Sequence, residues 1–539
     1  MKNYFICILF LYIFLNSSII KAQYNYNHVY YINGTGDDIS NSCTEDSQCY
    51  SIDKVVYVFL QEINGYYYYS NYPPLTIYMG EGASVFSNVD FRPSYPSSSS
   101  SSYSSSPIGL YGFNFTLIGT SEGGVGLINN NSFPFFSIET DFQTKQTYLN
   151  FININYGAFG NAQCLSSNAA NSTSITDSAD FIELSALYNV LVKVTFENFT
   201  YSCKYNDKAF IMVQGEPNPE QSASEDWTTF NTAYSFPSTL YSFSFINSVF
   251  QNSFGSVSLE LASPILNSTY CPVTLEFIQS SLSSNVQPQS PLFLMGRGQL
   301  IVEKSNFFAS PETSSNCYEP IFQMGNVEVY FNDNQVSMWP VHQSTLINCD
   351  GCFFTGVSNN ISSTFFSSNR SCASENQSLF SFSRSSSTIL NSNITMDELY
   401  PSTISAKPNL IYASQSQISL RSNYISSTIG SALNYQSVKS FMFSNVFSSK
   451  SFNPYVNCDK NYQNSFNGDK FSTDIGSNHG SNCNSFVQKQ KLQNAFIFSA
   501  IGVGGTFGSL LFLYISRYII RRCSGPIDDN EKHKIISRY

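Results

Sequence analysis

The chain has 539 residues, of which 42% are hydrophobic, 16% aromatic and only 12% charged, and its formal net charge is −11. This length and apolar content suffice for a large core. Without the basic signal and the basic tail described below, the net charge is −16, which argues against nucleic acid and against acidic polysaccharide attracted by charge. Abundant Ser, Asn, Tyr and Phe favour short strands and polar turns, so we expect an all-β chain.

The amino terminus has the layout of a cleavable secretory signal, residues 1–22, in which Lys2 precedes an apolar run from Tyr4 to Leu15. The run is too short to favour spanning a bilayer. Because Ile20 stands where a small residue usually precedes cleavage, an uncleaved anchor remains the alternative.

A strand from Val29 is followed by a Gly/Asp loop that holds Cys43 and Cys49, and then by a helix. Ser51 is placed to cap this helix, Asp53 lies in its first turn, and its apolar residues share one face: Ile52, Val55, Val56, Phe59, Leu60 and Ile63. We expect the helix to cover the open end of a stack of coils.

Short units of alternating apolar and polar residues then recur, each broken by Asn, Ser or Asp and followed by a large apolar residue. They include the stretches 191–200, 242–252, 299–310, 327–337, 418–427 and 439–448. Repetition at a few tens of residues predicts a parallel β-helix from about 29 to 452, and the alternative is a set of unrelated strands in one or two β-sandwiches. Asn306, Asn334, Asn423 and Asn445 are interpreted as left-handed corner residues.

The apolar residue after each corner sets the register of the coils. We assign it to Phe250, Leu282, Phe308, Val336, Phe353, Ile394, Ile425 and Phe447. The interval from Val336 to Phe353 is short for a full coil, so the register there stays open.

The order Asn33-Gly34-Thr35-Gly36-Asp37-Asp38, paired Cys, short helix and Leu75–Gly82 (LTIYMGEG) resembles the amino-terminal cap and first coil of right-handed parallel β-helix proteins of the pectin-lyase-like superfamily, particularly membrane-anchored surface members found in amoebae. The cap resemblance covers 29–82, and a weaker one extends to about 452. It implies a fold, because that superfamily includes polysaccharide lyases, hydrolases and proteins without known chemistry.

The Ser-rich stretch 97–107 and the polar stretches 161–176 and 215–226 are expected to be loops on the coils. Ten Asn-x-Ser/Thr sequons precede the late apolar segment, and we expect many to be glycosylated: Asn33, Asn114, Asn130, Asn171, Asn198, Asn267, Asn360, Asn369, Asn376 and Asn393.

The predicted extracellular part holds 11 cysteines, and a secreted context favours disulfides. By proximity the pairs are Cys43 with Cys49, Cys164 with Cys203, Cys271 with Cys317, and Cys458 with Cys483. The Cys349-x-x-Cys352 motif is interpreted as a local disulfide at a turn, in preference to a redox or zinc site, and Cys372 is left over.

The stretch 453–494 is expected to form a terminal cap and stalk. Residues 495–516 then supply an uncharged run of the length that crosses a bilayer, followed by a tail, 517–539, with six basic and three acidic residues. A type I plasma-membrane protein is predicted, with an endolysosomal location as the alternative because Glu531–Ile536 is similar to an acidic di-leucine signal. Gly504 and Gly508 form a G-x-x-x-G that could mediate a homodimer, and Cys523 is a candidate for palmitoylation.

Hydrolysis of a glycan needs two opposed carboxylates, and polygalacturonases of the superfamily carry Asn-Thr-Asp, Asp-Asp, Gly-His-Gly and Arg-Ile-Lys. Here Asp-Asp occurs only at Asp37–Asp38 and Asp528–Asp529, and the other motifs are absent. The cluster Asp177, Asp180 and Glu183 is interpreted as a solvated face, Arg297 as a turn residue, and His28, His342 and His479 as isolated. No catalytic, metal or cofactor site is therefore assigned, and a non-enzymatic adhesion or recognition protein is preferred over a tethered lyase or hydrolase.

Overall fold

The computed structural model describes residues 28–63, 73–81, 108–110, 114–121, 125–127, 136–140, 146–156, 181–186, 191–201, 209–214, 241–252, 265–284, 291–309, 320–341, 345–365, 378–398, 409–427, 432–449, 456–458, 463–467 and 469–471. Structural statements below refer to these residues. The predicted signal, the Ser-rich stretch 97–107, the predicted span with Gly504 and Gly508, and the tail with Cys523 lie outside them.

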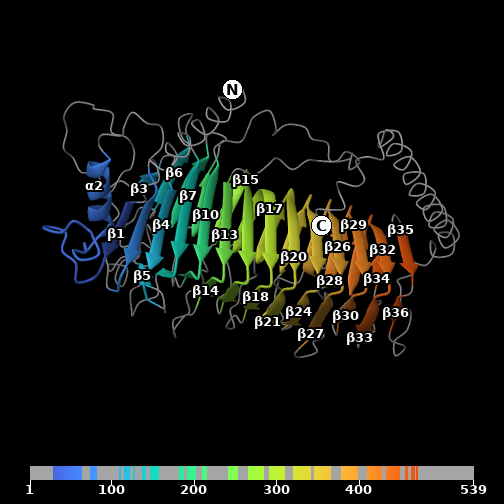
Figure 1. Cartoon of the computed structure of the whole chain (residues 1–539). Coiled ribbons are helices and arrows are strands. Elements are labelled where there is room, and N and C mark those ends of the chain that lie inside the picture. The colour runs from blue at the N-terminus through green and yellow to red at the C-terminus, as the bar shows by residue number, and fades with distance from the viewer. Residues whose placement is uncertain are drawn as a thin grey trace, which may run out of the picture.

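The described chain forms a long stack of parallel strands, through which the colours of Figure 1 advance in chain order from blue to orange. A complete coil has three strands, as in Phe322–Gly325 (β19), Val327–Asn332 (β20) and Gln335–Val341 (β21). The third strands form one sheet of 12 strands, and the first and second strands together form one sheet of 24.

The third row consists of β5 (Val125–Leu127), β8 (Ile154–Tyr156), β11 (Thr200–Tyr201), β14 (Val249–Asn252), β16 (Ser281–Ser284), β18 (Asn306–Ala309), β21, β24 (Asn360–Phe365), β27 (Asn393–Glu398), β30 (Tyr424–Ser427), β33 (Val446–Ser449) and β36 (Lys470–Phe471). The first row consists of β3 (Ile108–Leu110), β6 (Phe136–Thr140), β9 (Ile182–Ala186), β12 (Ile211–Gln214), β19, β22 (Ile347–Asp350), β25 (Ser378–Ser383), β28 (Asn409–Ser414), β31 (Leu433–Gln436) and β34 (Val456–Cys458).

The middle row consists of β1 (His28–Ile32), β2 (Leu75–Met79), β4 (Asn114–Gly119), β7 (Thr147–Ile152), β10 (Val192–Glu197), β13 (Tyr241–Ile246), β20, β23 (Phe353–Val357), β26 (Ser386–Leu390), β29 (Gln417–Arg421), β32 (Lys439–Phe443) and β35 (Gln463–Asn467). Two long strands, β15 (Leu266–Ile278) and β17 (Phe293–Glu303), belong to both the first and the middle row and join them.

The strands pair in parallel and in register from β1 with β2 to β32 with β35. This pairing excludes the β-sandwich alternative, whose sheets are antiparallel. It establishes the expected parallel β-helix and is consistent with a right-handed coil. The stack continues to Phe471, into the stretch that the sequence suggested as cap and stalk.

Alternation along each strand explains why the coils stack. In β20, Val327, Val329 and Phe331 are buried, whereas Glu328 and Tyr330 are partly exposed. Neighbouring coils place aromatic rings in face-to-face contact inside the stack, as Phe196 does with Phe151 at 5.1 Å and with Phe245 at 4.6 Å between ring centroids. One coil buries little alone, so the core exists only because coils repeat.

The register differs from the sequence-based assignment at two positions. Phe307, not Phe308, pairs between Leu282 and Val336, and Ile361, not Phe353, follows Val336. Phe308 and Phe353 instead point outward, with 45% and 37% of their surfaces exposed.

Each coil turns at single residues with positive φ, but the predicted asparagines are not those residues. The corner before β18 is Lys304, and the corners before Asn334, Asn423 and Asn445 are Asp333, Ser422 and Ser444, with φ between 51° and 55°. The prediction was therefore displaced by one position for these three asparagines, and Asn306 begins β18.

At the corners that precede the third row, from Ser248 onward, the residue after the corner forms a ladder of hydrogen bonds through the core. Its side chain accepts a bond from the backbone N–H of its equivalent one coil earlier, which has no partner in a strand. The acceptors are Ser248, Ser280, Ser305, Asn334, Asn359, Ser392, Asn423, Asn445 and Asp469, and they accept at 2.8 to 3.4 Å.

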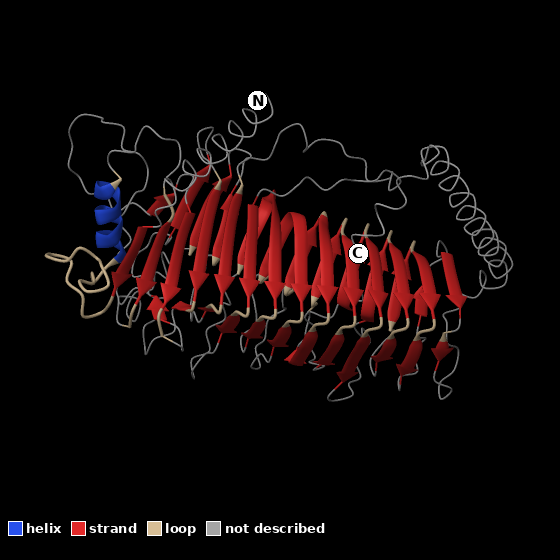
Figure 2. Ribbon diagram, in the orientation of Figure 1, coloured by secondary structure: helices blue, strands red, loops and turns tan. Residues whose placement is uncertain are grey.

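The helix α2 (Ile52–Glu62) lies at the amino-terminal end of the stack, drawn in blue in Figure 2. As expected, Ser51 precedes it and accepts from Lys54 N–H, and Asp53 lies in its first turn. Val55, Val56 and Phe59 on its apolar face are fully buried and share one core with Ile32 of β1.

Candidate functional site

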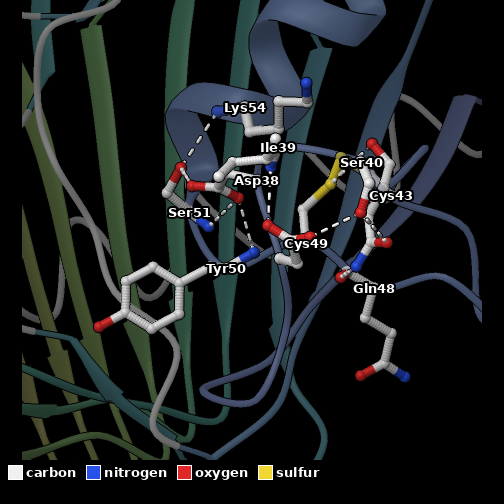
Figure 3. The surroundings of a disulfide bond; sticks show 11 residues. Asp38, Ile39, Ser40, Cys43, Gln48, Cys49, Tyr50, Ser51 and Lys54 are labelled. Atoms are coloured by element: carbon white, nitrogen blue, oxygen red, sulfur yellow. Dashed lines mark hydrogen bonds between the residues drawn. A yellow bond between two sulfur atoms is a disulfide. The ribbon is translucent and has the colours of Figure 1, made fainter.

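The Gly/Asp loop before α2 is held by carboxylates that perform a structural task. Asp38 accepts hydrogen bonds from Tyr50 N–H and Ser51 N–H at 2.7 and 3.0 Å, and Ser51 Oγ donates to it at 2.5 Å (Figure 3). Asp37 accepts from Ser40 Oγ and Ile39 N–H, and these bonds hold the pKa of its carboxyl below the usual range. Both carboxylates therefore organise the loop rather than face a substrate.

The same loop carries the one disulfide in the described part of the chain, which joins Cys43 to Cys49 in the pairing suggested by the sequence. Gly36 lies against it so closely that an added Cβ would stand 2.2 Å from the carbonyl oxygen of Cys49. Only glycine fits there, which explains one residue of the motif that carried the family resemblance.

The predicted local disulfide between Cys349 and Cys352 is not formed in the structure, where both are buried free thiols on either side of the left-handed corner Gly351. Cys271 is a buried free thiol as well, and its predicted partner Cys317 lies outside the described residues. Burial raises the pKa of the Cys349 thiol, and the thiol of Cys352 is oriented toward the carbonyl oxygen of Met324 at 3.6 Å. The pair fills core positions of the coil, and the partners proposed for the remaining pairs, as well as Cys372, include residues outside the described part.

Of the residues considered for catalysis, those in the described part of the chain do not converge. Asp177, Asp180, His342 and His479 lie outside the described residues. Glu183 Oε1 on β9 accepts a hydrogen bond from Gln214 Nε2 at 3.0 Å. His28 Nδ1 lies 3.2 Å from Oε2 of Glu62, the last residue of α2. Arg297 belongs to strand β17, next to the corner Gly298, so its assignment to a turn was displaced by one position.

In the part of the chain that is described, no group of three His, Cys, Asp or Glu side chains could hold a metal ion. Three carboxylates on the outer faces of the coils have close polar partners. Glu276 accepts from Ser244 Oγ at 2.5 Å, Glu303 pairs with Lys304 at 2.9 Å, and Asp350 accepts from Arg384 Nε at 2.8 Å.

One group on the middle row combines a carboxylate, an amide, a phenol and an exposed ring. We call Gln299, Glu328, Tyr330 and Phe353 the central ledge. Glu328 accepts from Gln299 Nε2 at 3.2 Å and from Tyr330 Oη at 2.6 Å, so both of its oxygens are engaged. Phe353 is its register neighbour on the next coil.

The central ledge is suited to holding a ligand rather than to proton transfer. The bond to Glu328, together with partial burial, raises the pKa of Tyr330, so the phenol stays neutral and keeps its proton. A ring that is 37% exposed beside fixed hydrogen-bonding groups offers both a stacking surface and polar partners. The sequence analysis missed the ledge because it placed Phe353 in the core. The short interval between Val336 and Phe353 was the sign that Phe353 is not the core residue of the next coil.

Among the predicted glycosylation sites, Asn114, Asn198, Asn360 and Asn393 are exposed, and Asn33 and Asn267 are partly exposed. Asn198 is itself a left-handed corner, and Asn393 donates to Asn360 on the neighbouring coil at 3.0 Å. Asn130, Asn171, Asn369 and Asn376 lie outside the described residues.

No helix in the described part of the chain is long and apolar enough to cross a membrane, and the predicted span 495–516 lies outside that part.

Comparison with known proteins adds little to this description. No family model matches the sequence, and no curated protein matches it. Among solved structures, the fold is similar to the A-module of the mannuronan C-5 epimerase AlgE6 from Azotobacter vinelandii, with a TM-score of 0.32 and 10% identity over 84% of this chain and 98% of that one. A similarity of this degree carries no conclusion about activity, and the fold is assigned here from its own strand pairing.

Proposed function

We propose that this chain is a non-enzymatic recognition protein of the cell surface, which binds a glycan or a protein along the outer face of its β-helix. The predicted signal and late apolar segment support single-pass type I anchoring in the plasma membrane, with an endolysosomal membrane as the alternative. The exposed sequons fit an extracellular location for the coils.

The observation that carries the proposal is the central ledge. Its carboxylate is already bound on both oxygens, its phenol holds its proton, and its exposed ring has no catalytic use. Catalysis on a glycosidic bond needs a pair of carboxylates free to act on opposite sides of that bond. Binding needs an apolar surface with a few fixed polar groups, and the ledge supplies these.

Loss of the exposed ring should weaken ligand binding. Cells that display the full chain are probed with a panel of fluorescent oligosaccharides and with unmodified cells, and we expect the Phe353→Ser variant to bind about tenfold more weakly, since a buried aromatic anchor typically contributes more than ~1 kcal/mol. Phe308→Ser is the matched control, because Phe308 is also an exposed ring, at 45% against 37% for Phe353, but lies on the third row.

Equal binding by both variants would exclude the central ledge as the site. The alternative function, a membrane-tethered lyase or hydrolase, makes a different prediction: a bound oligosaccharide would be shortened, and changing a single coil carboxylate, as in Glu276→Gln or Glu303→Gln, would abolish that turnover.

A further inference from the structure

The last coils carry a surface group that is unlike the rest of the described faces. Four apolar side chains stand exposed on two adjoining sheets, Tyr424 at 44%, Phe441 at 37%, Phe443 at 46% and Val446 at 39%. Exposed Arg421 and Lys439 lie among them. We call these six residues the aromatic–basic patch, and they lie on β29, β30, β32 and β33, at the end of the stack farthest from α2 (Figure 1).

In a strand with one solvent-exposed face, polar residues usually point outward and apolar residues inward, and in the patch this order is partly reversed. In β32, the polar Ser440 is buried at 1% exposure, whereas Phe441 and Phe443 point outward. A shift of register by one residue would bury both rings, but the ladder residue Asn445 and the pairing of β32 with β29 fix the register. Exposed rings held in this way indicate a contact surface.

The basic side chains lie over the aromatic rings. Lys439 Nζ is 5.4 Å from the ring centroid of Phe441, and Arg421 Cζ is 5.9 Å from that of Phe443. Aromatic and basic residues together are the combination found at the interface between lipid and water, where the ring enters the headgroup layer and the cation meets phosphate. The positive charge is notable in a chain whose net charge is −11.

The position of the patch in the chain also favours lipid. Only residues 472–494 separate β36 from the predicted span, so the patch lies on coils that are close in the chain to the predicted membrane segment. All ten sequons downstream of the signal occur between Asn33 and Asn393, and none occurs from 394 to 494. The coils after Asn393 therefore carry no sequon, and Asn393 itself pairs in register with Tyr424 at the edge of the patch.

We propose that the aromatic–basic patch rests on the surface of the bilayer that anchors the chain, so that the last coils lean sideways against lipid headgroups. The inference rests on the anchoring part of the proposed function. Since the patch lies on the side wall of the stack, this contact tilts the axis of the stack away from the membrane normal. The last coils then touch the bilayer, and the coils nearer α2, with their glycans, lie farther from it.

The test uses the full chain reconstituted in vesicles of phosphatidylcholine, because anionic lipids are concentrated in the cytoplasmic leaflet and the coils are expected on the other side, with or without bromine on the acyl chains. A Phe443→Trp variant should lose fluorescence to brominated lipid and be shielded from acrylamide, relative to the unaltered chain. Phe353→Trp, which lies on the same row of strands nearer the middle of the stack, is the control and should show neither effect. Replacing Arg421 and Lys439 by Gln in the Phe443→Trp background should weaken the quenching.

Equal quenching of the two tryptophan variants would overturn the proposal. So would protection of the Phe443→Trp variant from acrylamide by a soluble anionic oligosaccharide without any quenching by brominated lipid, because the patch would then be a glycan site. Flotation with the vesicles after an alkaline wash reports anchoring separately. A chain that floats but is not quenched contradicts only the patch, whereas one that does not float contradicts the anchoring as well.

Discussion

Corner residues and ladder residues are neighbours in the chain and have different tasks. Left-handed φ is adopted by asparagines such as Asn198 and Asn391, which favour it, and also by Lys304, Gln415 and Ser422, which do not. Of the asparagines that stood out in the sequence, Asn334, Asn423 and Asn445 are one position after such a corner, where a buried side chain accepts one bond and donates another. The sequence revealed that a turn was present, but the role of each residue depends on the coil above it.

Asn334 offers a direct test of the ladder. Its Oδ1 accepts from Ser305 N–H at 2.9 Å, and its Nδ2 donates to the carbonyl of Val302 at 3.0 Å. Asn334→Val leaves the buried Ser305 N–H and the Val302 carbonyl without these bonds. It should lower the free energy of unfolding by about 2–4 kcal/mol, seen as a lower midpoint of thermal unfolding. Asn334→Ser should lose less, since Ser occupies the equivalent place at Ser305, and similar midpoints for the two variants would contradict the ladder.

At the scale of elements, strands and helix were predictable because each depends on a local pattern. The alternation of β20 and the helical spacing around Val55 and Phe59 are legible without a partner. The register of β23 was not, since FFTGV supplies an aromatic residue at both its first and second positions and only pairing with β20 and β26 selects Phe354 as the buried one. This ambiguity hid both the true core residue and the exposed ring of the central ledge.

The helix α2 supplies an element-scale prediction, namely that it covers the first coil. Phe59 is fully buried and meets the ring of His28 edge-on at 5.3 Å between centroids. Phe59→Asp places an uncompensated charge there at a cost of several kcal/mol, so we expect little chain at the cell surface, measured with an amino-terminal tag. The Tyr57→Asp variant changes a helix residue that is 55% exposed, so its chain should reach the cell surface normally. Equal surface amounts for the two variants would exclude a covering role.

At the scale of the whole molecule, the expectation of a β-helix followed by a membrane segment rests on two independent sequence patterns. The coil repeat predicted the stack, which the parallel pairing from β1 to β36 bears out. The anchoring rests on the sequence alone. What the chain binds depends on which side chains gather across several coils, and such gathering cannot be read from any single stretch.

The last prediction concerns topology. The apolar run 495–516 has the length of ~20 residues that crosses a bilayer, and Arg517, Arg521 and Arg522 follow it closely. Basic residues remain on the cytoplasmic side, and a signal sends the coils to the other side. Protease added to intact cells should therefore remove an epitope placed after Gln23 and spare one placed after Arg522. Detergent provides the control, because both epitopes should then be lost. Loss of only the carboxy-terminal epitope on intact cells would reverse the orientation and place the central ledge and the exposed sequons inside the cell.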